Sequence, residues 1–262
     1  MTDNSPTDRH VLVTGAGSGI GAAIAAAFVK AGARVTLTGR RREALVARQN
    51  SVGGSGRTHV VADFDVTDEA KVKAGVKSAR NAFGPVDILV NNAGEAPSAP
   101  FAKTDLATWS KVLAVNLTGT FLVTREVIPD MIAKRTGRVI NVASTAGLVG
   151  YAYVSAYVAA KHGVVGLTRS LALEFARAGI TVNAVCPGYT ETPLLERAVD
   201  NIVAKTKRGR DEARAALAAS NPQGRLVTPE EVANTALWLA SDAAGSITGQ
   251  AIAVAGGEVM TG

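Results

Sequence analysis

Apolar, β-branched segments alternate with helical patterns along almost the whole of this 262-residue chain. The first segment, His10–Thr14, is followed by glycines and an alanine-rich stretch in which Ile20, Ile24 and Phe28 share one helical face. Gly32 stands where that helix should end, and the next apolar segment begins directly after it. Strands are predicted at His10–Thr14, Ala33–Thr38, Thr58–Ala62, Val86–Asn91, Arg138–Ala143, Thr181–Cys186 and Ala251–Val254, and helices near Asp68–Phe83, Leu106–Lys134, Ala156–Arg177 and Pro229–Ala240.

This alternation predicts an α/β fold. Because the strands are almost continuously apolar, helices should cover both faces of a parallel sheet. We expect a Rossmann-type, doubly wound sheet of about seven strands. No linker or shift in composition divides residues 1–262, so a single domain is predicted. One long connection begins at Pro187-Gly188, and a connection of this length is more often functional than passive, so residues 188–228 are expected to form a mobile or helical substrate flap.

The composition excludes several other classes of protein. With 47% hydrophobic and 19% charged residues the chain can fill a core and is unlike a disordered one. No apolar run approaches the roughly 18–20 residues that span a bilayer, and the first ten residues lack the apolar stretch of a signal peptide. We therefore expect a soluble, cytoplasmic protein. The single cysteine, Cys186, excludes an internal disulfide, and His10 and His59 lack partners at metal-ligand spacing, so no metal site is expected.

The net charge of +6 does not indicate a nucleic-acid partner. The basic clusters are short, and aromatic residues make up only 5% of the chain, which leaves few side chains for base stacking. A modest positive field would equally attract small anionic substrates.

The glycines between the first strand and the first helix indicate a phosphate-binding turn. The segment Thr14–Gly21 reads TGAGSGIG. Glycines allow backbone to approach a pyrophosphate closely, and the helix that follows offers free N–H groups to the anion. A glycine cluster can also be a plain turn, but its position between a strand and a helix favours a dinucleotide site.

The chain resembles the short-chain dehydrogenase/reductase family over nearly all of residues 10–257. The motifs that carry the resemblance are TGAGSGIG, Asn91-Asn92-Ala93-Gly94, Asn116, Ser144, Tyr157-x-x-x-Lys161 and Pro187-Gly188, in the order of that family. The resemblance implies an oxidoreductase that uses a nicotinamide dinucleotide. It also implies a homotetramer in which helices 106–134 and 156–177 pair across two-fold axes.

The resemblance further implies a set of cofactor-binding residues. Asp65 and Val66 should border the adenine, and Thr190 and Thr192 should hold the nicotinamide carboxamide. Asp65 could instead be a turn or capping acid, and the threonines could cap the following helix. The full predicted set is Gly15, Ser18, Gly19, Ile20, Gly21, Arg40, Asp65, Val66, Asn92, Ala93, Gly94, Tyr157, Lys161, Pro187, Gly188, Thr190 and Thr192.

The end of the second strand favours NADP(H). An NAD site places an acid there for the ribose hydroxyls, but no Asp or Glu occurs between Gly21 and Glu43. Arg40 could pair with a 2′-phosphate through charge-assisted hydrogen bonds. Alternatively, the arginine cluster simply opens a helix in solvent. Ser18 stands where some relatives carry a basic residue, so the phosphate clamp is incomplete, and NAD(H) stays possible.

Tyr157 and Lys161 lie four residues apart, on one face of a predicted helix. Such a pair is common on exposed helices, but the glycine loop and Ser144 favour catalysis. A neighbouring ammonium and a positive nicotinamide should lower the phenol pKa, so that Tyr157 acts as general acid and base. By resemblance, Ser144 binds the substrate oxygen, Lys161 also holds the ribose, and Asn116 anchors a water that completes the proton path.

The substrate is expected to be an uncharged acyl group or ring, because the segments around the nicotinamide are mostly small or apolar. The similarity is greatest to ketoreductases of 3-oxoacyl thioesters, whose phosphates could meet Arg135, Arg138 and Arg177 if these are exposed. Tyr151 or Tyr153 should line the pocket, whereas His162 and Cys186 are expected to be packing or surface residues. Two alternatives stay open: an NAD(H)-dependent dehydrogenase of another secondary alcohol (cyclic, aromatic or steroidal), and a non-catalytic dinucleotide-binding protein. The second predicts a loss of the Ser/Tyr/Lys group, which is intact here.

Overall fold

Parallel strands form the centre of the molecule. The computed structural model describes residues 6–206 and 208–260. Within them a seven-stranded sheet has the order β3-β2-β1-β4-β5-β6-β7, and every neighbouring pair is parallel. The strands are β1 (His10–Thr14), β2 (Arg34–Thr38), β3 (Thr58–Val61), β4 (Ile88–Asn91), β5 (Gly137–Val142), β6 (Ile180–Pro187) and β7 (Ala251–Val254). The predicted fold class is confirmed.

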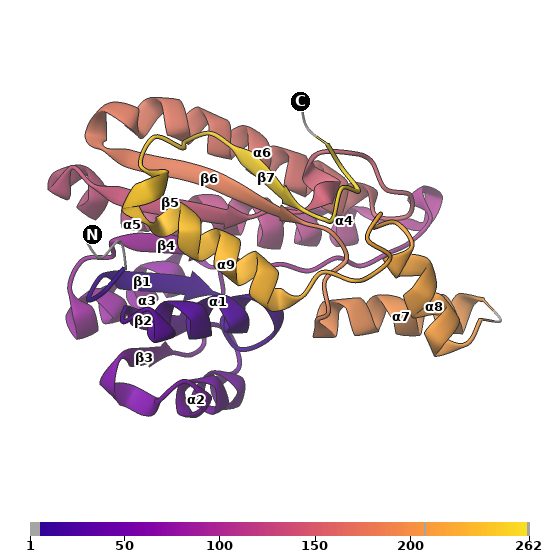
Figure 1. Cartoon of the computed structure of the whole chain (residues 1–262), viewed down its shortest axis with the longest axis horizontal. Coiled ribbons are helices and arrows are strands. Elements are labelled where there is room, and N and C mark those ends of the chain that lie inside the picture. Colours follow the sequence, from indigo (N-terminus) through magenta and orange to yellow (C-terminus); the bar gives the residue numbers. More distant parts are fainter. Residues whose placement is uncertain (1–5, 207, 261–262) are drawn as a thin grey trace.

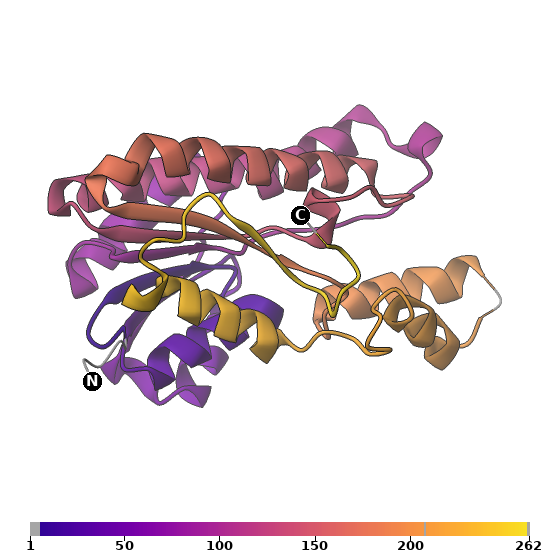
Figure 2. The same cartoon turned by 45° about the horizontal axis from the view of Figure 1, so that its top comes forward.

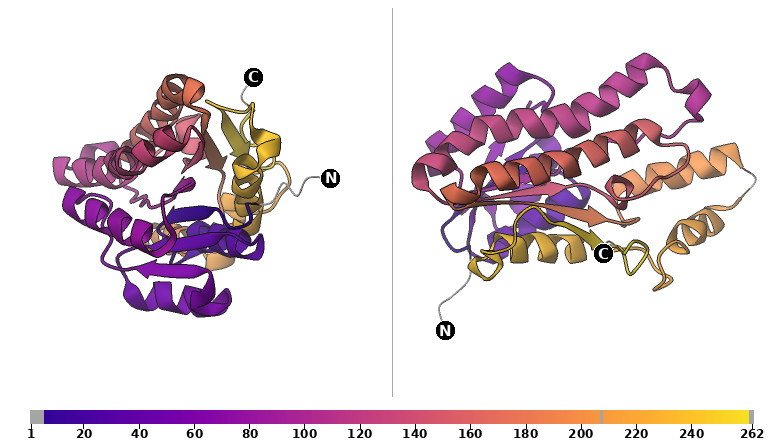
Figure 3. Two further views of the ribbon diagram at one scale, coloured as in Figure 1. Left: turned by 90° about the vertical axis from the view of Figure 1, so that its left-hand side faces the viewer. Right: turned by 90° about the horizontal axis from the view of Figure 1, so that it is seen from above.

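Helices cover both faces of this sheet. They are α1 (Gly19–Lys30), α2 (Arg42–Ser51), α3 (Glu69–Phe83), α4 (Leu106–Leu113), α5 (Gly119–Lys134), α6 (Ser155–Phe175), α7 (Pro193–Lys205), α8 (Arg210–Ala218) and α9 (Pro229–Ala240). Helices α1, α2 and α9 pack on one face, and α3, α5 and α6 pack on the other. Figure 3 shows α5 and α6 side by side, with α9 across the sheet from them.

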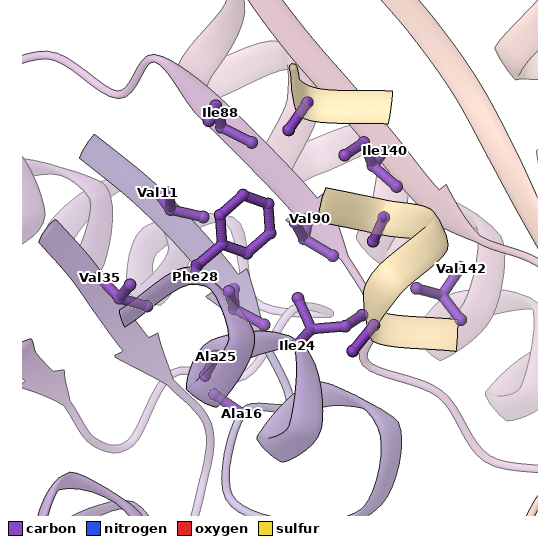
Figure 4. Close-up of a cluster of buried hydrophobic side chains, with 14 of the residues drawn as sticks. Val11, Ala16, Ile24, Ala25, Phe28, Val35, Ile88, Val90, Ile140 and Val142 are labelled. Atoms are coloured by element: carbon purple, nitrogen blue, oxygen red, sulfur yellow. The ribbon is translucent and has the colours of Figure 1, made fainter. Parts of the chain in front are cut away.

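The larger core lies between the sheet and the α1–α9 pair. Phe28 and Ile24 of α1 point toward Val11, Val90 and Ile140 of the central strands, as Figure 4 shows. All five side chains are almost completely buried. Burial of side chains of this size is worth roughly 1.5–3 kcal/mol each. This packing holds α1 along the sheet, so that its first turn stays at the carboxyl end of β1.

The chain between β4 and β5 differs from its prediction. One helix was predicted over Leu106–Lys134, but a π-helical turn, Ala114–Thr118, separates α4 from α5. By length and composition the whole stretch is apolar enough to cross a membrane, the one such case in the described residues. However, Val123, Val127 and Met131 pack in the core beneath the sheet, as in a helix of a globular domain.

The long connection after β6 is helical. It contains α7 and α8, which were not predicted individually, and Thr192 begins α7 by accepting a hydrogen bond from the Leu195 amide. Figure 1 and Figure 2 show both helices, in orange, beyond the carboxyl ends of the strands. Ion pairs of Arg210 and Arg214 with Glu196 join the two helices. We refer to residues 188–228 as the flap.

Candidate functional site

A cavity of about 870 Å³ opens at the carboxyl ends of the strands, between the sheet and the flap. Loops that follow parallel neighbouring strands meet at this edge, which is where doubly wound folds bind ligands. The cavity is lined by part of the predicted site: Ile20, Arg40, Gly94, Ser144, Tyr157, Pro187, Gly188, Thr190 and Thr192. Residues from distant parts of the sequence are thus brought to one space.

The glycine loop has the geometry of a cradle. Gly15 and Gly19 have φ values of +67° and +55°, a backbone conformation that favours glycine. A Cβ on Gly21 would stand 2.3 Å from Asn92 Nδ2 and 2.5 Å from Gly15 O. The first turn of α1 carries no acidic residue and no side-chain cap from Ser18. Its N–H groups and the positive end of the helix dipole therefore suit an anion.

Hydrogen bonds join the glycine loop to the segment after β4. Thr14 Oγ1 accepts from the backbone amides of Asn92 and Ala93, at 2.9 and 3.0 Å. The Asn92 side chain donates in return to Thr14 O at 2.9 Å and to Gly15 O at 3.3 Å. Asn92 therefore holds the backbone of the glycine loop at Thr14 and Gly15.

Ser144 and Tyr157 line the cavity, and the buried Lys161 lies next to Tyr157. Ser144 lies two residues after β5 and caps the short helical turn Thr145–Gly147, and its Oγ accepts a hydrogen bond from the Ala146 amide at 3.1 Å. Lys161 Nζ donates to Val142 O at 2.8 Å and lies 5.5 Å from the centre of the Tyr157 ring. Both Tyr157 and Lys161 belong to α6, whose four-residue spacing places them a turn apart.

Burial controls the titration of these groups. It raises the pKa of Tyr157 to about 12, although the Ser144 hydroxyl opposes the shift. Burial also lowers the pKa of Lys161 to about 8, so the ammonium is still the main form at pH 7. The expected lowering of the Tyr157 pKa by Lys161 does not appear among the described residues: burial dominates the shift, and the group that lowers the pKa is the Ser144 hydroxyl.

Asn116 has a buried oxygen that lacks a partner. The π-helical turn directs its side chain inward, where Nδ2 donates to Glu95 O at 2.9 Å and to Val112 O at 3.0 Å. Its Oδ1 accepts no hydrogen bond from the described residues. A buried acceptor of this kind normally binds a water or a ligand donor.

Several predicted cofactor residues have local partners. Asp65 accepts from the amide and hydroxyl of Thr67, and the Thr67 amide, helped by Arg40, holds the pKa of Asp65 below its usual value. These contacts are those expected of a turn acid, which was the alternative interpretation of Asp65. The same holds for Thr192, which caps α7, whereas Thr190 donates to Gly188 O. Val66 is buried against the helix of Gly119.

One group of charged residues was interpreted wrongly. Arg135 and Arg177 are exposed, but Arg138 is 8% exposed and pairs with Asp242 at 3.5 Å. Arg135 precedes β5 and Arg138 is its second residue, so both lie at the amino end of the strand, whereas the cavity lies at the carboxyl ends. The three arginines therefore do not form a group that could meet a substrate at the cavity.

One of the two tyrosines Tyr151 and Tyr153 was expected to line the pocket, and both line the cavity. Tyr189, which was not predicted individually, lines it as well. Arg197 and Asn201 of α7 also line the cavity. The sequence indicated them only as part of the predicted flap. His162 is exposed and Cys186 is buried, as expected.

A nicotinamide dinucleotide fits the residues of this site. The anion-binding turn and the unpaired Asn116 oxygen are features that a bound dinucleotide and its ordered water would use. The glycine loop with the start of α1 would hold the pyrophosphate, and Arg40 would face the adenosine ribose.

Comparison with known proteins agrees with this geometry. The pattern of the short chain dehydrogenase family matches residues 9–202. A ketoacyl reductase assigned to the granaticin polyketide synthase of Streptomyces violaceoruber is 44% identical over 94% of this chain and 91% of its own. D-beta-hydroxybutyrate dehydrogenase of Rhizobium meliloti is 39% identical over 95% and 98%. A crystal structure of an actinorhodin polyketide ketoreductase variant with NADPH superposes with a TM-score of 0.92, at 39% identity over 96% and 97% of the two chains.

We predict that Gly21→Ala disrupts the cradle. The added methyl group must displace the Asn92 amide or the Gly15 carbonyl, which should destabilise the fold by about 1–3 kcal/mol. It should also weaken dinucleotide binding at least as strongly. Thermal unfolding and fluorescence titration with NADPH measure both effects. Gly56→Ala, in the turn before β3, is the matched control, because its methyl group would meet nothing within 4 Å of the described residues and Gly56 lies outside the cavity. A Gly21→Ala protein with unaltered stability and NADPH affinity would contradict the close-contact argument.

Proposed function

The chain belongs to the short-chain dehydrogenase family and is an oxidoreductase of that family, and we propose that it interconverts a 3-oxoacyl thioester and its 3-hydroxyacyl form with NADP(H). The observation that carries the proposal is that Ser144 and Tyr157 share one cavity with the end of the glycine loop and with Arg40. Proton-transfer groups and a dinucleotide cradle are then adjacent.

Tyr157 is the proton donor in the reduction. A nicotinamide dinucleotide held by the glycine loop would supply the hydride for the carbonyl carbon. The Ser144 hydroxyl donates a hydrogen bond to the carbonyl oxygen and stabilises its growing negative charge. Tyr157 is neutral at pH 7 and transfers its proton to that oxygen. The nearby Lys161 ammonium stabilises the resulting phenolate, because the positive charge of the lysine attracts the negative charge of the ionised tyrosine.

Asn116 is proposed to complete the proton path. Its buried, unpaired Oδ1 would accept a hydrogen bond from a water, and that water would connect the Lys161 ammonium with solvent. The two bonds donated by Nδ2 hold the amide so that Oδ1 stays oriented inward. After each reduction, protons would reach Tyr157 along this path.

The proposed preference for NADP(H) rests on Arg40. This exposed guanidinium forms no ion pair among the described residues and lies beside the cavity, where a 2′-phosphate could take both of its outer N–H groups. The NADPH named for the similar ketoreductase structure supports the same preference. Gly39 supplies no carboxylate that would repel the phosphate.

The proposed thioester substrate fits the shape and charge of the cavity. Its wall contains mostly small or apolar side chains, among them Ala96, Leu194 and Leu195, which suit an acyl chain. Arg197, an exposed cation of α7 at the same cavity, replaces the misassigned arginines as a contact for a phosphorylated thioester carrier. The ketoacyl reductase among the relatives supports this substrate class.

A second candidate is an NAD(H)-dependent dehydrogenase of a different secondary alcohol. The similarity to D-beta-hydroxybutyrate dehydrogenase, at 39% identity, favours this alternative. The same catalytic group would serve it, so only the substrate and the cofactor distinguish the two.

We also propose that the chain is a cytoplasmic homotetramer. Phe121 on α5 and Leu173 on α6 are exposed apolar side chains on the two helices that are expected to pair. Pairing of these helices with a second copy would cover both residues.

The substrate is tested with a panel of ketones. Purified protein with NADPH should reduce an acetoacetyl thioester with a higher kcat/KM than cyclic or aromatic ketones, followed by loss of dihydronicotinamide absorbance. Reduction of free ketones alone would overturn the thioester proposal and favour the second candidate. Failure to reduce any carbonyl compound would overturn the proposed reaction.

The cofactor preference is tested at Arg40. Hydrogen bonds to charged groups are worth about 1.5–3 kcal/mol, so Arg40→Ala should lower kcat/KM for NADPH roughly 10- to 100-fold. The value for NADH should change little, because NADH lacks the 2′-phosphate. Arg177→Ala removes an equal charge from a distant exposed site and is the control. Equal losses with both cofactors would show that Arg40 does not recognise the phosphate.

A further inference from the structure

Glu258 brings the segment after β7 against the wall of the cavity. Its Oε1 lies 2.6 Å from the hydroxyl of Tyr151, which is also 2.9 Å from Thr145 Oγ1. A carboxylate cannot donate a hydrogen bond, so the single phenolic proton goes to Glu258 and Tyr151 accepts from Thr145. Tyr151 also contacts Tyr189 edge to face, with ring centres 6.3 Å apart. The carboxylate thus anchors the aromatic part of the wall.

The second carboxylate oxygen lies close to another part of the wall. A Cβ on Gly188 would stand 2.8 Å from Glu258 Oε2 and 3.1 Å from the Cβ of Ala255, so the carboxylate would have to shift to make room for a side chain there. The backbone turn that presents Glu258 is closed by its own amide, which donates to Ala255 O at 3.1 Å. Because Tyr151 and Gly188 both line the cavity, the negative charge is fixed directly behind its surface.

No ion pair of the described residues neutralises this charge. None of the ion pairs formed within residues 6–206 and 208–260 includes Glu258. Glu95 also lines the cavity, but it pairs with Lys111 at 3.3 Å. The cations Arg40, Lys111 and Arg197 also line the cavity, and of these three only Lys111 forms an ion pair within the described residues. Glu258 is thus a carboxylate next to the cavity wall that forms no ion pair with a described residue.

We propose that Glu258 is a specificity-determining residue, which rejects substrates that carry a free carboxylate near the reacting carbon and admits their uncharged ester and thioester counterparts. The inference rests on the proposed ketone reduction. Two like charges in a partly buried site repel each other much more strongly than in water. The hydrogen bond from Tyr151 acts in the same direction, because it engages a proton that could otherwise bind an anionic substrate. An ester experiences neither penalty.

The test compares acetoacetate with ethyl acetoacetate, which share the reacting ketone and differ in charge. Wild-type protein with NADPH should have a much higher kcat/KM for the ester. In Glu258→Gln the amide oxygen can still accept from Tyr151, but the negative charge is gone. The ester-to-acid ratio should then fall roughly tenfold or more, because the value for the acid rises. Glu230→Gln, an exposed carboxylate of α9, is the matched control and should leave the ratio unchanged.

The outcomes separate the inference from the proposed reaction. An unchanged ratio in a Glu258→Gln protein of wild-type thermal stability would overturn the inference and leave the proposed reaction intact. A ratio that falls only because the ester is turned over more slowly would also overturn it, since this indicates a structural role. If wild-type protein reduces neither compound, the proposed reaction fails. Calorimetric titration of both compounds into NADPH-loaded protein then decides: tighter binding of the acid by Glu258→Gln supports the inference, and equal binding overturns it.

Discussion

The attachment of β1 to the loop after β4 is the constraint on which the site depends. Thr14 receives two backbone amides from this loop, and the Asn92 side chain donates back to the start of the glycine loop. This reciprocal bonding leaves no space for a side chain at Gly21. The start of α1 is thereby fixed at the carboxyl edge of the sheet, and the packing of Phe28 against the central strands holds the rest of the helix. The cavity opens at this same edge of the sheet.

Loss of hydration determines the protonation states of Tyr157 and Lys161. Burial moves the pKa of Tyr157 up and that of Lys161 down, so at pH 7 the pair consists of a neutral phenol and an ammonium. A neutral phenol can donate a proton, and a desolvated ammonium stabilises an adjacent anion more strongly than one in water. The two shifts therefore suit the pair to protonate a carbonyl oxygen, although neither brings the phenol pKa to neutrality.

Features set by local sequence were predictable, and features set by distant contacts were not. The strand His10–Thr14 and the glycines after it follow from patterns within a few residues, and the structure confirms the strand. The π-helical turn at Asn116 was missed because one extra residue per turn barely changes a helical pattern. Arg138 looked like a surface charge because its partner, Asp242, is far away in the sequence. Glu258 contacts Tyr151 across 107 positions, so no local signal marks it as part of the cavity wall.

The central claim is that the Tyr157 hydroxyl supplies the proton in carbonyl reduction. The most direct measurement is the turnover of Tyr157→Phe with NADPH and a reducible ketone, together with its NADPH dissociation constant and with Tyr153→Phe as the control at the cavity rim. The account predicts that Tyr157→Phe loses roughly 100- to 10,000-fold in kcat, as expected for removal of a general acid. Its NADPH affinity and its fold should be retained, and Tyr153→Phe should stay active. Wild-type turnover in the folded, NADPH-binding Tyr157→Phe protein would contradict the account.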